Sequence, residues 1–330
     1  MTESPVVDLT DPSEIAATND PTATNDPTAT ILAIDIGGTK MAAGIVTVGG
    51  EVRDHRQIPT DQPGRDADGL FAALVELVAT VRAASTDRGE PDPIVCGVGC
   101  GGPMTWGGEA VSPMNIGAWR SFPLRSRLES ALALPTFVDN DAKALALAEG
   151  WTGAAVGHRD YLGMVVSTGV GGGIVLDGRL LDGAEGNAGH IGHITVEPEG
   201  HLCRCGNRGC LEAEASGTGI AAITGRPSAE AGPEVVTRTG TLVGRAVATV
   251  ATLLDLRLAV VAGSVALGFG APFFAAAQAE IDDRARLDFA RGCVIRPAAL
   301  GAEGPIVGAA AVGRRGLEGH GGRDRPGPRQ

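Results

Sequence analysis

Polar ends enclose a long body in which apolar runs alternate with glycine-rich turns. From Ile31, the segment ILAIDIGGTKMAAGIVTV consists of an apolar run, a short turn and a second apolar run of strand length. This pattern predicts a β-hairpin. The segment YLGMVVSTGVGGGIVLDG, from Tyr161, repeats the pattern about 130 residues further on. Two such hairpins predict a duplicated fold whose halves face one another.

Other segments carry the signals of helices. In LPTFVDNDAKALALAEGW an apolar strand ends at Asp139 and Asn140, and Asp141 begins a run of strong helix formers. GPIVGAAAVGRRGL, residues 304–317, predicts a helix that returns to the first half of the fold. In DADGLFAALVELVATVRAAS the apolar residues have the spacing of an amphipathic helix, at Leu70, Phe71, Leu74, Leu77, Val78 and Val81.

These elements predict an α/β protein of two lobes, each with a mixed sheet flanked by helices, and a cleft between the lobes. We assign the small lobe to residues 31–139, joined by the C-terminal helix at about 304–316, and the large lobe to residues 140–303. Residues 1–30, in which ATNDPT occurs twice, and residues 317–330 are polar and poor in large apolar residues. We expect both tails to be disordered, because they bury too little apolar surface to offset the entropy of ordering.

The charge and hydropathy of the chain argue against nucleic acids and membranes as binding partners. The 330 residues carry a formal net charge of −12 and a sequence pI near 5.0. Nucleic acids and anionic membranes attract clustered Lys and Arg, so we expect neither as a partner. No stretch approaches the roughly 20 apolar residues of a membrane span, and the amino terminus lacks the pattern of a secretory signal. The sequence therefore predicts a soluble, cytoplasmic protein.

The turn of the first hairpin has the residue types that bind phosphate. Gly37, Gly38 and Thr39, followed by Lys40, can present backbone N–H groups and side-chain donors to phosphate oxygens. Asp35 ends the first strand beside this turn, where its carboxylate can hold Mg²⁺. The spacing differs from that of a Walker P-loop, G-x-x-x-x-G-K-[ST], which also leads into a helix.

The second hairpin and a third glycine-rich segment contain similar candidate phosphate-binding residues. In AVVAGSVALGFG, residues 259–270, we expect a strand that passes through Gly263 and Ser264 to another glycine turn before a helix-like segment. The candidate phosphate-binding residues of the two segments are Ser167, Thr168, Gly169, Gly171, Gly263 and Ser264. Each turn taken singly also fits an ordinary tight hairpin. Together, the turns predict that the two halves hold one polyphosphate between them.

A short run, GHIGHITVEPEGHLCRCGNRGCLE, has the spacing of a metal site. It places one imidazole and three thiols, those of His193, Cys203, Cys205 and Cys210, close together in sequence. Such a set is a standard tetrahedral zinc environment with no open position for a reactive water, so we expect a structural role. The alternative is scattered buried thiols, which is the simplest interpretation for Cys96, Cys100 and Cys293. His201 lies two residues before Cys203, and we interpret it as a loop residue.

Asp141 is the candidate catalytic base. With Asn140 it occupies a strand-to-helix junction, which directs both side chains toward a ligand at the carboxyl edge of the sheet. Such residues also cap helices, at a benefit of about 1 kcal/mol. The position between two phosphate-type turns favours a base, because phosphoryl transfer needs a carboxylate to accept the proton of the attacking hydroxyl.

Taken together, these motifs resemble those of the ROK family of bacterial sugar kinases and sugar-responsive repressors, within the actin-like and hexokinase-like ATPase superfamily. DIGGTK at 35–40 looks like the first phosphate motif, STGVGGGIV at 167–175 like the second, and CRCGNRGCLE like the family's zinc motif. The resemblance implies a two-lobed fold with ribonuclease H-like lobes, ATP, Mg²⁺ and structural Zn²⁺ as cofactors, a hexose substrate, and a homodimer.

By the same resemblance, Asp141 deprotonates the sugar 6-hydroxyl. The residues implied to contact the sugar or to line its pocket are Gly102, Pro103, Asn115, Asn140, Asp141, His193 and Glu212. One position departs from the family: AGHIGH stands where glucose kinases usually have AGEIGH, so His190 replaces a sugar-binding glutamate. An unpaired buried hydroxyl costs about 1–3 kcal/mol, so the preferred hexose is expected to change. Alternatively, His190 accepts the bond through an unprotonated nitrogen and recognition survives.

Three functions remain open at this point: a kinase for glucose or a related hexose, a sugar-responsive transcriptional regulator, and a sugar-binding protein without turnover. The family's repressors carry a helix-turn-helix domain before the first phosphate motif, whereas about thirty polar residues precede Ile31 here. The intact phosphate turns and Asp141 favour the kinase, with ATP or polyphosphate as the phosphate donor.

Overall fold

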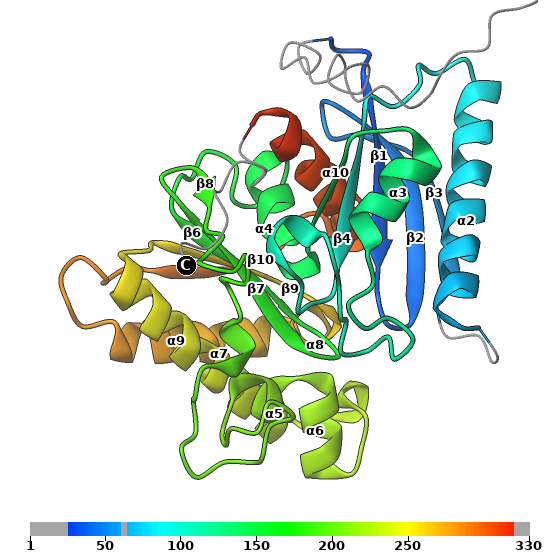
Figure 1. The fold of residues 1–330 in the computed structure, drawn as a ribbon. Helices are drawn as coiled ribbons and strands as arrows, with labels where there is room; N and C mark the ends of the chain where they lie inside the picture. Colours follow the sequence, from blue (N-terminus) through cyan, green and yellow to red (C-terminus); the bar gives the residue numbers. More distant parts are fainter. Residues whose placement is uncertain (1–25, 61–64, 320–330) are drawn as a thin grey trace, which may run out of the picture.

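The computed structural model of the chain describes residues 26–60 and 65–319 (Figure 1). Most of the two expected tails, residues 1–25 and 320–330, lies outside the described residues. At the described ends, the first strand begins at Thr30 and the last helix ends at Leu317.

The first sheet combines an antiparallel meander with two parallel strands. The meander is β1 (Thr30–Ile36), β2 (Lys40–Thr47) and β3 (Val52–Pro59). β4 (Val95–Cys100) pairs parallel to β1, and β5 (Thr136–Asn140) pairs parallel to β4. The strand order is therefore β3-β2-β1-β4-β5.

The second sheet repeats this topology. Its meander is β6 (Tyr161–Val166), β7 (Val170–Leu176) and β8 (Arg179–Leu180). β9 (Leu258–Ala262) and β10 (Val294–Pro297) extend it in parallel on the other side of β6, giving the order β10-β9-β6-β7-β8. The same order in both sheets confirms the predicted duplication, and both hairpins are present as antiparallel pairs.

Two helices lie between the sheets and connect them (Figure 1). α4 (Asp141–Trp151) packs against β6 and β7, and α10 (Gly304–Leu317) packs against α4, β1 and β4. A Cβ atom at Gly97 would lie 2.0 Å from the carbonyl oxygen of Ala309, so the backbones of β4 and α10 are in direct contact. The predicted return of the C-terminal helix to the first sheet is confirmed.

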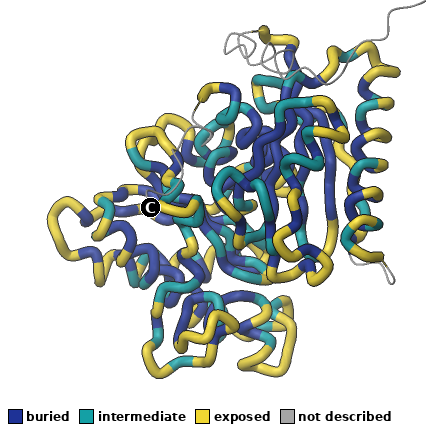
Figure 2. The backbone as a smooth tube through the Cα atoms, in the orientation of Figure 1, coloured by how far each residue is buried: buried dark blue, intermediate teal, exposed yellow. Residues whose placement is uncertain are grey.

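The remaining helices cover the outer faces. α2 (Ala67–Asp87) packs on β2 and β3 and buries the apolar stripe expected from the sequence, and α3 (Leu124–Leu132) lies near β5. α7 (Pro233–Leu254) and α9 (Ala271–Arg284) pack on each other beside the second sheet. Figure 2 shows the outward faces of α2 and α9 exposed, whereas the central strands β1, β4, β6 and β9 are almost wholly buried.

By length and composition, α2 is the one helix among the described residues that could cross a membrane. Most of its buried residues belong to the apolar core of the first sheet.

The remaining helices of the described residues are short. They are η3 (Trp106–Gly108), η4 (Ile191–His193), α5 (Leu211–Ala215), α6 (Gly217–Thr224), η5 (Ser228–Glu230), α8 (Ser264–Phe269) and η6 (Gly301–Glu303). One of them corrects the sequence interpretation. Ser264 does not lie in a strand that continues to a glycine turn, because α8 begins at Ser264 itself. The cause is Gly263, whose φ of 102° redirects the chain from β9 straight into the helix.

Candidate active site and metal centre

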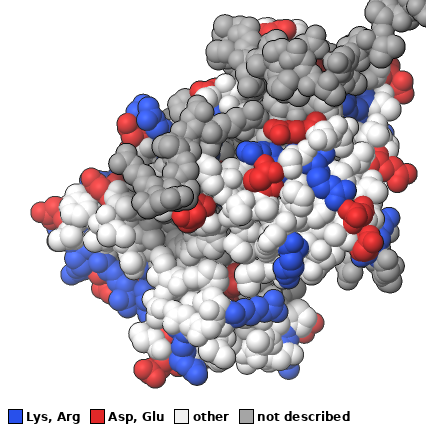
Figure 3. All heavy atoms as spheres, viewed as in Figure 1, with Lys and Arg blue, Asp and Glu red and all other residues white. Residues whose placement is uncertain are grey.

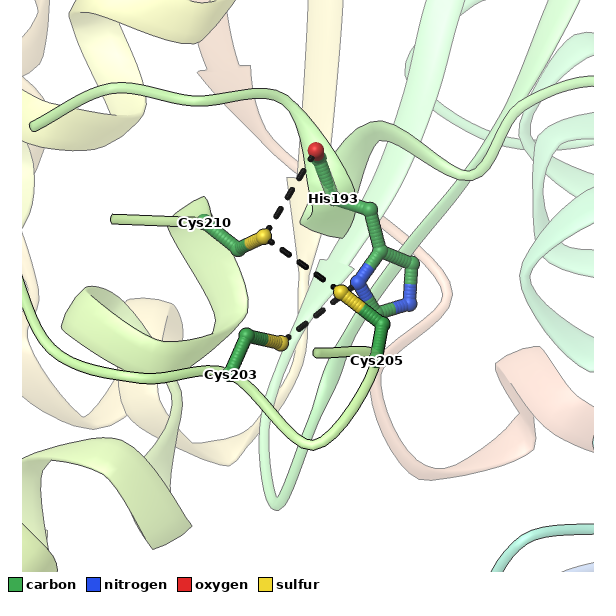
Figure 4. Close-up of side chains that lie close together, drawn as sticks. All are labelled: His193, Cys203, Cys205 and Cys210. Atoms are coloured by element: carbon green, nitrogen blue, oxygen red, sulfur yellow. Dashed lines mark hydrogen bonds between the residues drawn. The ribbon is translucent and has the colours of Figure 1, made fainter. Parts of the chain in front are cut away.

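The histidine and three cysteines of the predicted metal site converge (Figure 4). The ligand atoms of His193, Cys203, Cys205 and Cys210 all lie within 4.8 Å of one another. Sγ of Cys205 lies 3.7 Å from Sγ of Cys210, and Sγ of Cys203 lies 3.7 Å from Nδ1 of His193. Zinc bonds of about 2.3 Å to sulfur give tetrahedral edges of roughly 3.8 Å, so the four ligands fit Zn²⁺.

Glycines and a buried acid shape this metal loop. Gly206 and Gly209 have φ values of 92° and 69°, and a Cβ atom at Gly209 would lie 1.6 Å from the carbonyl oxygen of Glu197. His201 lies outside the ligand cluster, as expected, because its Nδ1 contacts the buried carboxylate of Glu214 at 3.0 Å. The other three cysteines, Cys96, Cys100 and Cys293, are buried core residues.

Asn140 and Asp141 begin α4 where the two sheets approach each other. Asn140 is the N-cap, and its Oδ1 accepts hydrogen bonds from the backbone N–H groups of Ala142 (3.0 Å) and Lys143 (3.4 Å). Capping therefore uses the oxygen of Asn140 and leaves its Nδ2 free to face Gly102, where a Cβ atom would lie 3.5 Å away. The Asp141 side chain keeps exposed surface, as a group that meets a substrate must.

Asp35 and Asp141 meet beside Gly99. A Cβ atom at Gly99 would lie 3.7 Å from both Oδ1 of Asp35 and Cα of Asp141. Burial raises the pKa of Asp35 to about 7, the charge of Asp141 raises it as well, and Lys40 opposes the shift. Although Asp141 keeps exposed surface, the surrounding protein removes enough water from its carboxylate to raise its pKa as well. Two desolvated carboxylates of like charge are an arrangement that a divalent cation neutralises, so the pair fits Mg²⁺.

His190 faces Asn140 and the Gly102–Pro103 segment. A Cβ atom at Gly102 would lie 3.9 Å from Nε2 of His190. On the other side of the ring, Nδ1 lies 2.9 Å from the carbonyl oxygen of Asn187. A carbonyl only accepts hydrogen bonds, so neutral His190 carries its hydrogen on Nδ1 and presents Nε2 as an acceptor.

Asn115 lies between the turn at Gly38 and the segment that contains Gly101 and Gly102. A Cβ atom at Gly38 would lie 2.6 Å from Nδ2 of Asn115, and one at Gly101 would lie 3.5 Å from its Oδ1. Two backbone hydrogen bonds hold Asn115 in this place. The N–H of Ser112 donates to the carbonyl oxygen of Pro103 (2.9 Å), and the N–H of Met114 donates to that of Gly102 (3.3 Å). Asn115 therefore lies closer to the phosphate turn than the sequence indicated.

The second phosphate turn contacts the residues that follow the metal loop. Oε2 of Glu212 accepts a hydrogen bond from the N–H of Val170 at 3.0 Å, beside Gly169. The hydroxyls of Ser167 and Ser264 lie 2.9 Å apart, which joins the second and third glycine segments. A Cβ atom at Gly171 would lie 2.8 Å from that of Ala142, so this hairpin also touches the first turn of α4.

Some residues at the site were missed from the sequence. Thr60, at the end of β3, donates from its Oγ1 to the carbonyl oxygen of Gly37 at 2.7 Å. Thr218, in the first turn of α6, donates from its Oγ1 to the carbonyl oxygen of Thr168 at 2.9 Å. The sequence around Thr218, SGTG, is of the same hydroxyl-and-glycine type as the recognised turns and could have been found by that signal. No such signal marks Thr60.

Positive and negative side chains are interspersed over the face drawn in Figure 3. Nucleic-acid binding uses clustered Lys and Arg. The described residues of this face form no large patch of positive charge. The absence of a nucleic-acid partner stays a prediction.

Comparison with known proteins gives a consistent set of relatives. The model of the ROK family matches residues 31–315. The chain is 42% identical to a glucokinase of Halalkalibacterium halodurans over 194 residues, which are 58% of this chain and 58% of that enzyme. It is 38% identical to an N-acetylmannosamine kinase of Escherichia fergusonii over 256 residues, 73% of this chain and 85% of that enzyme. The structure of a ROK family glucokinase from Streptomyces griseus with glucose and AMPPNP superposes with a TM-score of 0.74 at 28% identity, covering 87% of this chain and 100% of the other.

Proposed function

The chain belongs to the ROK family, and we propose that it is an ATP-dependent hexose kinase that phosphorylates the 6-hydroxyl of glucose or a related sugar. The relatives named above are sugar kinases, which supports a phosphotransferase. The observation that carries the proposal is the meeting of Asp35 and Asp141 beside Gly99. It brings the carboxylate of Asp35, near the end of β1, close to the first residue of α4, and the charge of Asp141 acts on it.

In this proposal Asp141 is the general base. It accepts the proton of the sugar hydroxyl, and its raised pKa makes it a stronger base than an ordinary aspartate. Asp35, with the turn Gly37–Gly38–Thr39 and Lys40, would hold Mg²⁺ and the phosphates of ATP, which supplies the phosphoryl group. Ser167, Thr168, Gly169 and Gly171 would hold the phosphates from the other lobe, and Gly263 and Ser264 lie next to them through the Ser167 contact.

In this proposal the hydrogen-bond donors and acceptors of the pocket recognise the sugar hydroxyls. Nδ2 of Asn140 is a donor, and Nε2 of His190 is an acceptor. With Nδ1 of His193 directed at the thiols, its Nε2 carries a hydrogen and can donate to the sugar. The carboxylate of Glu212 accepts, while Gly102, Pro103 and Asn115 complete the wall. Because His190 still offers an acceptor, we propose that hexose binding survives the loss of the family's glutamate and that only the ranking of sugars changes.

The ligand set His193, Cys203, Cys205 and Cys210 would hold a structural Zn²⁺. Burial raises the pKa of the Cys210 thiol to about 12, with further increases from its neighbouring thiols. Three thiolates in contact therefore need a cation to stay ionised together. A filled tetrahedral site stabilises the loop and orients His193 without taking part in the chemistry.

We further propose a two-lobed division near residues 139 and 140 from the order of the elements, a homodimer from the family resemblance, and a cytoplasmic location from the charge and hydropathy of the sequence. The alternative function is a sugar sensor, either a transcriptional regulator or a binding protein without turnover. Such a protein would bind sugar without releasing ADP.

The test is an ADP-release screen over glucose, mannose, fructose, glucosamine, N-acetylglucosamine and N-acetylmannosamine, with ATP and with polyphosphate, beside calorimetric binding of each sugar. We expect sugar-dependent ADP release for at least one hexose. Binding without release would contradict the kinase and favour the sensor. In the same screen His190→Glu tests the specificity proposal, because an unchanged ranking of sugars would show that this position does not set the preference.

A further inference from the structure

Four charged side chains form a closed cluster beneath the first turn of α4. Nζ of Lys143, which is 2% exposed, lies 2.8 Å from Oδ1 of Asp139 and 3.2 Å from Oδ1 of Asp182. From α10, Arg315 contacts Oδ2 of Asp139 at 3.2 Å and Oδ2 of Asp182 at 2.8 Å. Each carboxylate thus contacts Lys143 through one oxygen and Arg315 through the other. Two positive charges balance two negative charges.

The cluster joins three elements that are distant in sequence. Asp139 is the next-to-last residue of β5 in the first sheet, Arg315 belongs to α10, and Asp182 follows β8 of the second sheet. Lys143 also donates to the carbonyl oxygen of Gly186 at 3.1 Å, so the segment 182–186 is held at two points. This segment leads directly into the sugar-pocket wall.

The backbone from Gly186 to Asn187 connects the cluster to hydrogen bonds that reach His190. Next to Gly186, the Nδ2 of Asn187 donates to the carbonyl oxygen of Met104 at 3.2 Å. The carbonyl oxygen of Asn187 then contacts Nδ1 of His190 at 2.9 Å. The position of Asn187 therefore sets the tautomer and the direction of the His190 ring.

Polar contacts hold the segment 182–186 beside a cavity, where apolar packing is incomplete. A cavity of about 50 Å³ borders Met104, Trp106, Gly186 and the cluster itself. Although burial raises the pKa of Asp182, the hydrogen bond and charge of Arg315 and the charge of Lys143 outweigh it and lower that pKa. Well-packed apolar residues often replace a buried ion cluster without loss of stability, so stability alone does not account for its presence.

We propose that Lys143, Asp182 and Arg315 are positioning residues for the sugar pocket: they fasten segment 182–187 to α4 so that His190 presents Nε2 to the substrate. The proposal rests on the assignment of His190 to the sugar pocket. It extends that assignment to residues that touch no substrate themselves.

The kinetic test uses charge-balanced variants. Lys143→Met and Asp182→Asn each leave one unbalanced charge, so both should lower Tm. The double variant is neutral again, with Asp139 paired to Arg315. We expect it to recover Tm while the KM for sugar stays raised about tenfold, with kcat and the KM for ATP within about threefold of wild type. Recovery of the sugar KM together with Tm would show a merely structural cluster and overturn the proposal.

Two further variants separate positioning from stability. Asn187→Ala removes the bond to Met104 without touching a buried charge and should also raise the sugar KM. Glu149→Gln is the matched control, because Glu149 is a fully buried carboxylate of the same helix that accepts from the N–H groups of Ala154 and Ala299 instead. It should lower Tm and leave the sugar KM unchanged. A sugar KM that rises as much in Glu149→Gln would contradict the proposal.

A sugar-independent readout keeps this inference distinct from the proposed function. Nitrogen chemical shifts of ¹⁵N-labelled histidine report which ring nitrogen carries the hydrogen, and comparison with His190→Gln assigns the signal. We expect hydrogen on Nδ1 of His190 in the wild type and its loss in the double variant and in Asn187→Ala. An Nδ1 hydrogen retained in all variants would overturn the inference. Failure of the wild type to bind any sugar would overturn the proposed function alone.

Discussion

The carboxylate of Glu212 accepts a hydrogen bond of 3.0 Å from the backbone N–H of Val170, in the second phosphate turn. The same oxygen would lie 2.8 Å from a Cβ atom at Gly169. A residue proposed to bind the sugar is therefore also a partner of the turn proposed to bind the phosphates. The two ligands should be coupled through this contact.

We expect Glu212→Gln to raise the KM for sugar and the KM for ATP together, each about tenfold. The amide can still accept from Val170, but it loses the charge assistance that makes such bonds about twice as strong. Steady-state kinetics with each substrate varied in turn measure both constants. The matched control is Glu199→Gln, an exposed glutamate of the metal loop, which should change neither. A rise in the sugar KM alone would disprove the coupling.

Asp35 should make the ligand-free protein less stable as the pH rises. Its folded-state pKa of about 7 exceeds the ordinary value of 3.8, so the folded state holds a proton that the unfolded state has released. The stability that this proton contributes is present below about pH 4 and is lost as the pH rises toward 7. We expect Asp35→Asn to raise the free energy of unfolding at pH 8 by roughly 1–3 kcal/mol without Mg²⁺ and nucleotide, and to abolish kinase activity.

Chemical denaturation at pH 5 and pH 8 measures this effect. The control is Asp288→Asn, since the Asp288 side chain is 94% exposed. The assignment is wrong if wild type and Asp35→Asn lose the same stability between the two pH values.

The contact between β4 and α10 should tolerate no side chain at Gly97. A Cβ atom there would lie 2.0 Å from the carbonyl oxygen of Ala309 and 2.5 Å from the backbone nitrogen of Gly313. We expect Gly97→Ala to destabilise the protein by about 3 kcal/mol or more, because backbone atoms on both elements must move apart. Gly268→Ala is the control, in a helical position with no atom within 4 Å of the added Cβ, and should stabilise by up to about 1 kcal/mol. Equal Tm values for the two variants would contradict the described packing.

The metal loop should contain one equivalent of zinc. Elemental analysis of the purified protein measures it directly, and a chelator strong enough to remove the metal should lower Tm. Cys205→Ser should lose the metal, whereas Cys293→Ala, which alters a buried thiol outside the cluster, should keep it. Normal folding and activity with far less than one equivalent of metal would exclude a structural site.

The sequence predicted most of the fold because its signals are local. The hairpin turns, the stripe on α2 and the start of α4 each depend on residues within one element, and the structure confirms all three. The ligand set around His193 was found for the same reason, since the loop 193–210 brings its own members together.

Contacts between distant segments were harder to predict. In the sequence, Lys143 looks like an ordinary polar residue of a helix. Only the tertiary structure brings it to Asp182, which also pairs with Arg315. Asn115 approaches Gly38 across 77 residues, through backbone pairing that no local pattern indicates. At Gly263 the positive φ needed to start α8 directly was not evident from a glycine alone.

The most direct test of the kinase assignment is the turnover of Asp141→Asn in the ADP-release assay. The asparagine keeps an acceptor for the N–H of Ala142, so the first turn of α4 should stay intact. The account predicts a fall in kcat of about 10²- to 10⁴-fold, with calorimetric affinities for sugar and nucleotide within a few fold of wild type. Turnover near the wild-type rate, with Asp288→Asn as the control, would contradict the assignment of Asp141 as the base.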